Sequence, residues 1–112
     1  MKEKFQPAVS GLVQGFKDAG IRTQIILACM AFVAGFVLRL SAIEWVAVII
    51  CMGLVISSEI LNTCIEKVCD LYTTENDERI RVIKDLAAGA VLVSALSALA
   101  CALIILISHL MR

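Results

Sequence analysis

A run of polar side chains interrupts an otherwise apolar segment in the middle of the chain. It contains Glu59, Asn62, Glu66 and Asp70. At about 100° per residue, these four side chains fall within roughly 80° of one another on a helix. A carboxylate placed where hydrocarbon begins costs a few kcal/mol unless it faces protein or a metal. The spacing therefore predicts a polar stripe on one helix face, and the cost of placing it there indicates that the stripe has a function.

The chemistry suggested by this stripe is the binding of a cation and phosphate. Carboxylates gathered in a partly dry place repel one another, and a divalent cation with bound phosphates relieves that repulsion. Lys84 and Asp85 stand at the start of the next apolar segment, opposite the stripe. The alternative is structural: the acids would pair with nearby basic side chains and hold the helices together. We favour the functional interpretation because three carboxylates and an amide share one face.

The composition indicates a membrane protein. The chain has 112 residues, of which 61% are hydrophobic, and its mean hydropathy is +0.95. This is well above the roughly half that soluble domains contain. Ten basic and ten acidic side chains cancel, so no overall positive field favours nucleic acid as a partner. Five cysteines lie within apolar stretches, in a pattern that fits neither a disulfide framework nor a zinc site.

The charges leave three nearly uncharged stretches, at residues 23–38, 45–58 and 86–111. Because a crossing helix needs about 20 mainly apolar residues, we expect membrane spans at about 23–43, 45–72 and 80–110. The first span would continue past Arg39, whose long side chain can reach the headgroups, and a tight turn at 40–44 would follow it.

An amphipathic helix at about 4–17 should precede the spans and lie on the membrane surface. Its apolar side chains recur with helical spacing, at Phe5, Val9, Leu12, Val13 and Phe16. The expected fold is thus all-α and integral to the membrane, with residues 1–112 forming a single domain.

The orientation of the spans follows from their flanking charges. Eight lysines and arginines lie on the side of the N-terminus and of the loop after the second span, against only Arg39 and Arg112 on the other side. The excess of positive charge predicts a cytoplasmic N-terminus in a multi-pass protein. Trp45 then marks the outer interface, and we interpret His109 as an interfacial residue at the same side.

Two segments resemble a known signature. The sequence EILNTCIEKVCD at 59–70, followed after a short loop by KDLAAGAV at 84–91, resembles that of the bacterial diacylglycerol kinase and undecaprenol kinase family. The similarity extends from Asp18 to Leu106 without a gap. Arg22 also resembles the family, and Glu44 with Trp45 resembles its undecaprenol kinase branch in particular.

The resemblance implies a homotrimer in the bacterial cytoplasmic membrane, with composite active sites at the subunit interfaces. It implies ATP as phosphate donor and Mg²⁺ as the metal. The acceptor would be a membrane lipid alcohol, so that diacylglycerol becomes phosphatidic acid or undecaprenol becomes undecaprenyl phosphate.

The resemblance also assigns roles to individual residues. Glu59 would be the catalytic base and would meet the lipid substrate. Glu66 would be a ligand of the metal and contact the nucleotide. Asp18 would be the other metal ligand. It stands where the family has its first metal-binding glutamate, whose side chain is one methylene longer. The remaining nucleotide contacts would be Glu75, Asn76, Asp77, Lys84 and Asp85.

These roles agree with what phosphoryl transfer requires, namely cations over the phosphates, an in-line hydroxyl and a group to accept its proton. Asn62 would fix the geometry of its neighbours beside the substrate. Ala88, flanked by Ala87 and Gly89, would let a lipid chain or a neighbouring helix approach closely.

Two other interpretations remain open: a non-catalytic small oligomeric membrane protein, whose acids line a water-filled seam, and an inactive kinase homologue. A pore should carry polar residues through the whole bilayer. Residues 45–56 and 92–107 contain hardly any, and the polar group is confined to one end of the spans.

Overall fold

The computed structural model describes residues 2–112, with side chains from residue 4 onward. It contains four helices, α1 (Lys2–Gly15), α2 (Ala19–Leu38), α3 (Ala42–Tyr72) and α4 (Glu78–Leu110). By length and composition, α2, α3 and α4 can each cross a membrane. The prediction of an all-helical chain with three apolar spans is confirmed.

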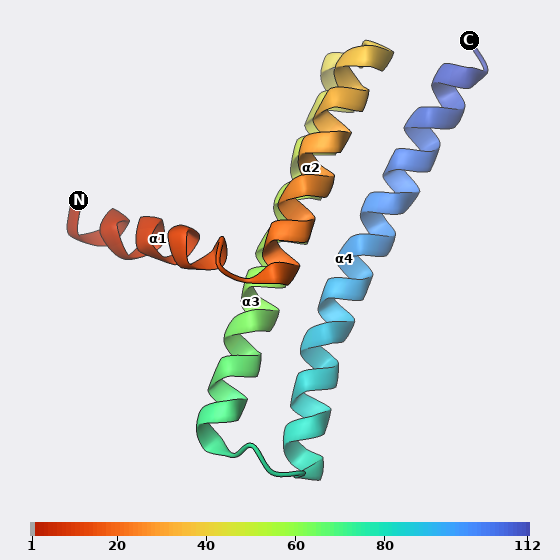
Figure 1. The fold of residues 1–112 in the computed structure, drawn as a ribbon. Coiled ribbons are helices and arrows are strands. Elements are labelled where there is room, and N and C mark those ends of the chain that lie inside the picture. Colours follow the sequence, from red (N-terminus) through yellow and green to blue (C-terminus); the bar gives the residue numbers. More distant parts are fainter. Residues whose placement is uncertain (1) are drawn as a thin grey trace.

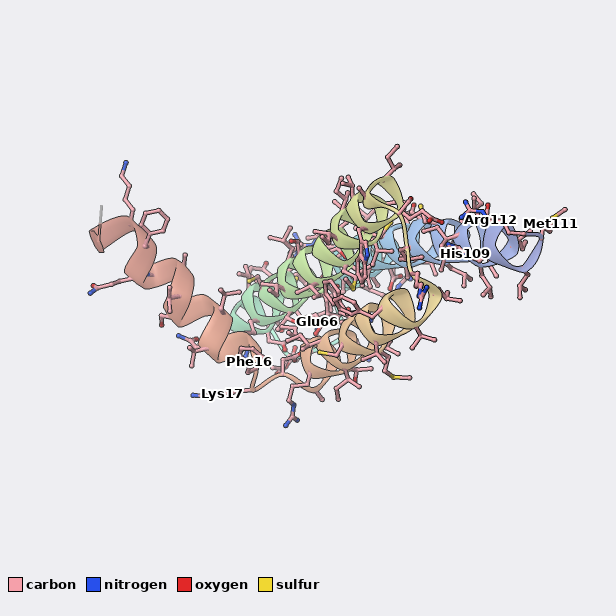
Figure 2. The ribbon with its side chains drawn as sticks, turned by 90° about the horizontal axis from the view of Figure 1, so that it is seen from above. Phe16, Lys17, Glu66, His109, Met111 and Arg112 are labelled. Atoms are coloured by element: carbon pink, nitrogen blue, oxygen red, sulfur yellow. The ribbon has the colours of Figure 1, made fainter. Side chains whose placement is uncertain are left out.

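The helix α3 is the centre of the arrangement, because both α2 and α4 pack against it. Figure 1 shows that α2 begins partway along α3, so the α3–α4 hairpin extends beyond it on that side. The helix α1 leaves the bundle at the level where α2 starts. Seen from above in Figure 2, Phe16 and Lys17 lie at the joint between α1 and α2, and His109 lies toward the other end of the molecule.

Very little of the apolar surface of the helices is buried within one chain. Only three hydrophobic side chains among those described are buried, those of Ile21, Cys69 and Ala87, at 3%, 4% and 7% exposure. The other large apolar side chains point outward along the spans. In a membrane protein such surface faces lipid or neighbouring helices.

The helix α1 ends two residues before the predicted position. The five apolar side chains predicted for this helix, including Phe16 just beyond its observed end, are all exposed, between 54% and 64%. They therefore remain free to enter a membrane surface, which stays a prediction. The chain turns at Lys17 and Asp18, whose amides donate to the carbonyls of Gln14 and Gly15 at 3.0 Å.

The first span ends earlier than predicted. The helix α2 stops at Leu38, because Arg39 adopts a left-handed conformation with φ of 56° and its amide turns back to the carbonyls of Gly35 and Phe36. The helix α3 then starts with a capping box, in which the Ser41 amide donates to Glu44 Oε1 at 2.9 Å. Hydropathy alone carried the prediction through to residue 43, because it does not detect either cap.

Aromatic packing joins α2 to α3 near their connecting turn. The Trp45 ring stacks on Phe32 with centroids 5.6 Å apart and is tilted against Phe36 at 4.9 Å. Gly35 makes this approach possible, since a Cβ there would lie 2.7 Å from Trp45 Cη2. Trp45 thus holds two helices together as well as standing at the predicted outer end.

His109 joins α4 to the start of α3 at the same end. Its Nε2 lies 3.1 Å and 3.0 Å from the two carboxylate oxygens of Glu44. The two side chains are only 12% and 14% exposed. His109 is therefore a contact between helices, in addition to its predicted place near the interface.

Three spans and the predicted cytoplasmic N-terminus would place the C-terminus on the opposite side of the membrane. A reporter fused after Arg112 should therefore be active only outside the cytoplasm, because charge asymmetry sets the orientation. Paired reporters that are active on opposite sides of the membrane, alkaline phosphatase and a fluorescent protein, measure this directly. A cytoplasmic C-terminus would contradict either the orientation or the number of spans.

Candidate active site

The first turn of α2 meets α3 at Glu59. Asp18 is the N-cap of α2, and its Oδ2 accepts a hydrogen bond from the Ile21 amide at 3.0 Å. Gly20 follows in the first turn. A Cβ on Gly20 would lie 2.6 Å from Glu59 Oε1 and 3.1 Å from Asp18 Oδ2. Two carboxylates that are far apart in the sequence therefore meet across a glycine.

The polar stripe of α3 continues from this meeting point. The Asn62 Nδ2 donates to Glu66 Oε1 at 3.1 Å. The Asn62 Oδ1 is buried and has no hydrogen-bond partner among the described atoms. Because an unsatisfied buried acceptor costs about 1–3 kcal/mol, this oxygen is suited to a cation or to a donor supplied by a ligand. Glu59 is also close enough to both Asp18 and Glu66 for their charges to interact.

Asp70, the last member of the stripe, pairs with a basic side chain of α4. Its Oδ1 lies 2.8 Å from Lys84 Nζ, with side chains 55% and 38% exposed. A pair this exposed contributes little stability. Asp70 thus has the basic partner that the structural alternative predicts, although this pair adds little to the stability of the helix contact. Among the described side chains, neither Glu59 nor Glu66 makes an ion pair.

The loop between α3 and α4 forms a polar cleft of about 730 Å³ with the start of α4. Five of the predicted nucleotide-binding residues line it together, and Glu66 lies outside it on α3. The lining residues are Thr73, Thr74, Glu75, Asn76, Asp77, Glu78, Ile80, Arg81, Lys84 and Asp85.

Asp77 orders this loop by capping α4. Its Oδ1 accepts from the Arg79 amide at 2.9 Å, and its Oδ2 lies 2.9 Å from Arg79 Nη2. Hydrogen bonds from Arg79, first from its side chain and then from its backbone, hold the pKa of Asp77 below its usual range. Asp77 therefore stays ionised at neutral pH and offers only hydrogen-bond acceptors to the cleft.

The sequence interpretation did not include Arg81, which lines the same cleft. Its guanidinium bridges Glu78 and Asp85, with 2.9 Å between Nη1 and Asp85 Oδ2. Asp85, which is predicted to contact the nucleotide, is thus paired with an arginine one helical turn before it. The sequence did contain a signal for these contacts: an acid, a base and an acid at 78, 81 and 85. Residues three and four apart are neighbours on a helix, so their side chains can pair.

An apolar cleft of about 460 Å³ lies between the spans and begins about one helical turn from Glu59, which does not itself line it. Its lining includes Gln24, one turn after Gly20, and Val55 and Ile56, about one turn before Glu59. Five alanines, two from α2 and three from α4, are among the other lining residues. Ala88, predicted to contact the substrate, is exposed and lines neither cleft.

The three apolar spans define a small polytopic membrane protein. Its acidic residues lie between a polar cleft and an apolar cleft, as in an active site for an amphiphilic substrate. The family model for prokaryotic diacylglycerol kinase matches residues 6–106, and the chain belongs to that family. The resemblance carried by residues 59–70 and 84–91 is thereby confirmed.

A named relative is undecaprenol kinase of Bacillus subtilis (strain 168). It is 43% identical over 68 residues, which cover 61% of this chain and 55% of that protein. The chain thus matches just over half the length of this relative.

Membership of a kinase family implies the use of ATP, which is commonly bound with Mg²⁺. Within the described part of the chain, no three His, Cys, Asp or Glu side chains converge as a metal site. Mg²⁺ bound with a nucleotide takes one or two carboxylates and fills its other positions with phosphate and water. Asp18, Glu66 and the free Asn62 Oδ1 are oxygen donors of the required kind.

Proposed function

We propose that this protein is an ATP-dependent lipid kinase that transfers the γ-phosphate of Mg-ATP to the hydroxyl of a membrane lipid alcohol. The observation that carries the proposal is the position of Glu59, at the inner end of the polar stripe and about one helical turn from the lining of the apolar cleft. An amphiphilic alcohol would fit both parts of this site, since its tail needs apolar surroundings and its hydroxyl needs a polar partner.

The order of groups along α3 supports a nucleotide in the loop cleft. From the loop inward come the pair of Asp70 with Lys84, then Glu66, then Glu59 and the apolar cleft. At 1.5 Å per residue, Glu59 and Thr73 are about 20 Å apart along the helix, and Glu66 lies midway. An extended nucleotide with its base in the loop would bring its terminal phosphates toward Glu66 and Glu59.

Phosphoryl transfer asks a protein mainly for position and charge. Glu59 accepts the proton of the lipid hydroxyl, and Asn62 orients its neighbours. Asp18 and Glu66 hold Mg²⁺, which when bound neutralises charge on the phosphates. Lys84 faces the phosphates. The other nucleotide contacts are Glu75, Asn76, Asp77 and Asp85.

The candidate acceptors are undecaprenol and diacylglycerol. The B. subtilis relative supports undecaprenol by its name, and the family model supports diacylglycerol by its description. Both alcohols fit the division between polar stripe and apolar cleft.

Incubating the purified protein with labelled Mg-ATP and each lipid in turn tests the proposal. We expect label in the lipid phase with one of the two alcohols, and none when Mg²⁺ is removed by a chelator. Hydrolysis of ATP without lipid transfer would contradict a lipid alcohol as acceptor. No reaction with either lipid would instead favour a non-catalytic membrane protein or an inactive homologue.

We also propose that the protein acts as a homotrimer in the bacterial cytoplasmic membrane, with its N-terminus in the cytoplasm. One chain buries only three hydrophobic side chains among those described, and its acidic stripe is largely exposed. A neighbouring subunit would cover that surface and help to enclose ATP and lipid.

Chemical cross-linking in mild detergent should therefore trap species up to trimers and none larger. Mass measurement of the uncross-linked protein in the same detergent provides the control for accidental cross-links. An active enzyme that is strictly monomeric would contradict the composite site.

A further inference from the structure

The backbone conformation at position 20 does not explain why the residue there is glycine. Its φ is negative, as for any helical residue, so no left-handed conformation requires glycine there. A glycine within a helix is about 1 kcal/mol less favourable than alanine. The space beside Gly20 offers the reason, because Glu59 Oε1 and Cδ lie 2.6 Å and 3.4 Å from the point where a Cβ would stand.

We propose that Gly20 is a positioning residue for Glu59: the missing side chain lets the Glu59 carboxylate lie against the first turn of α2 beside Asp18. This inference rests on the proposed function, in which Glu59 accepts the proton of the lipid hydroxyl. It adds a residue of α2 that touches neither ATP nor lipid but sets where the base stands.

The atom that a new Cβ would meet is the far end of a flexible side chain. Glu59 is half-buried and makes no ion pair with a described side chain, so a change of rotamer relieves the clash. The helix itself stays intact and gains in propensity. The carboxylate, however, leaves Asp18 and the start of the apolar cleft. A displacement of about 1 Å can lower a rate by as much as a hundredfold.

The first test compares Gly20→Ala with Gly11→Ala. Gly11 is also a helical glycine and has no atom within 4 Å of its would-be Cβ, which makes it a matched control. For Gly20→Ala we expect kcat to fall by about tenfold or more, with KM for Mg-ATP changed less than about twofold. Its Tm should not fall. Gly11→Ala should have the same kcat, KM for Mg-ATP and Tm as the wild type.

A second variant separates placement from general disturbance of the site. Glu59→Asp shortens the side chain by one methylene and removes most of the conflict with a Cβ at position 20. Adding Gly20→Ala to Glu59→Asp should therefore cause little further loss, because the two substitutions act on one contact. If the two losses simply multiply, or if Gly20→Ala alone keeps kcat within about twofold, the inference is wrong.

Labelling with the apolar reagent dicyclohexylcarbodiimide measures the placement without turnover. In Gly20→Ala, Glu59 should react at least about threefold more slowly than in the wild type, since its carboxylate has left the start of the apolar cleft, and Glu66 should be unchanged. Equal rates for Glu59 would contradict the inference. Failure of the wild type to phosphorylate either lipid would instead contradict the proposed function, and the labelling ratio would still decide where Glu59 stands.

Discussion

Glu59→Gln should lower kcat by roughly a hundredfold or more while KM for Mg-ATP stays within about twofold. Glutamine keeps the size and the hydrogen-bonding capacity of the side chain but cannot accept the proton of a lipid hydroxyl. The nucleotide would still bind, because the loop cleft and Glu66 are untouched. Initial rates over a range of ATP concentrations, with lipid saturating, measure both constants.

Glu44→Gln is the matched control for this substitution. Glu44 lies near the opposite end of the same helix, where it contacts Ser41 and His109. The same chemical change there should leave kcat and KM close to their wild-type values. Near-normal turnover of Glu59→Gln on both candidate lipids would mean that Glu59 is not the base and that the stripe is structural.

Glu66→Gln should produce the other kind of defect. It removes one of the few negative ligands available to a divalent ion, so KM for Mg-ATP should rise by about tenfold with a smaller change in kcat. Raising the Mg²⁺ concentration should restore part of the loss, because the weakened step is binding of the metal with its nucleotide.

A Mg²⁺ titration at fixed ATP distinguishes these outcomes. Glu66→Gln should need more Mg²⁺ for half-maximal rate, whereas Glu59→Gln should need no more than the wild type. A Glu66→Gln enzyme whose rate is low at every Mg²⁺ concentration, with unchanged KM, would place Glu66 in the chemical step instead.

The local order of the site was predictable from the sequence. The spacing of Glu59, Asn62 and Glu66 put them on one helix face, and the structure joins Asn62 to Glu66 through a hydrogen bond. The loop residues at 75–77 and the Lys84–Asp85 pair follow one another closely in the chain, and one cleft brings them together. Helical periodicity and short loops are local properties, which is why a pattern reveals them.

The contacts between helices were not predictable in the same way. Asp18 and Glu59 meet across Gly20, and Glu44 meets His109 65 positions further on. No periodicity within one helix indicates which residue of another helix lies opposite. The end of α2 was also placed wrongly, because the left-handed Arg39 interrupts a sequence that remains apolar on both sides.

The stripe also contains two kinds of acid that the sequence could not separate. Asp70 is paired with Lys84, whereas Glu59 and Glu66 have no such partner among the described side chains. The difference arises because α4 brings its first turns alongside the end of α3, whereas α2 begins partway along α3 (Figure 1). The first turn of α2 meets Glu59 beside Gly20. Within the stripe, the two acids without a basic partner are the ones to which we assign metal binding and proton transfer.

The transfer itself can be followed with ATP whose three non-bridging γ-oxygens are ¹⁸O. Direct attack of the lipid hydroxyl on the γ-phosphorus predicts a lipid phosphate that carries all three heavy oxygens and keeps the lipid's own light oxygen, as mass spectrometry would show. Glu59→Gln should form the same product far more slowly. The absence of labelled lipid phosphate from both undecaprenol and diacylglycerol, with the wild-type protein folded and ATP present, would contradict the account.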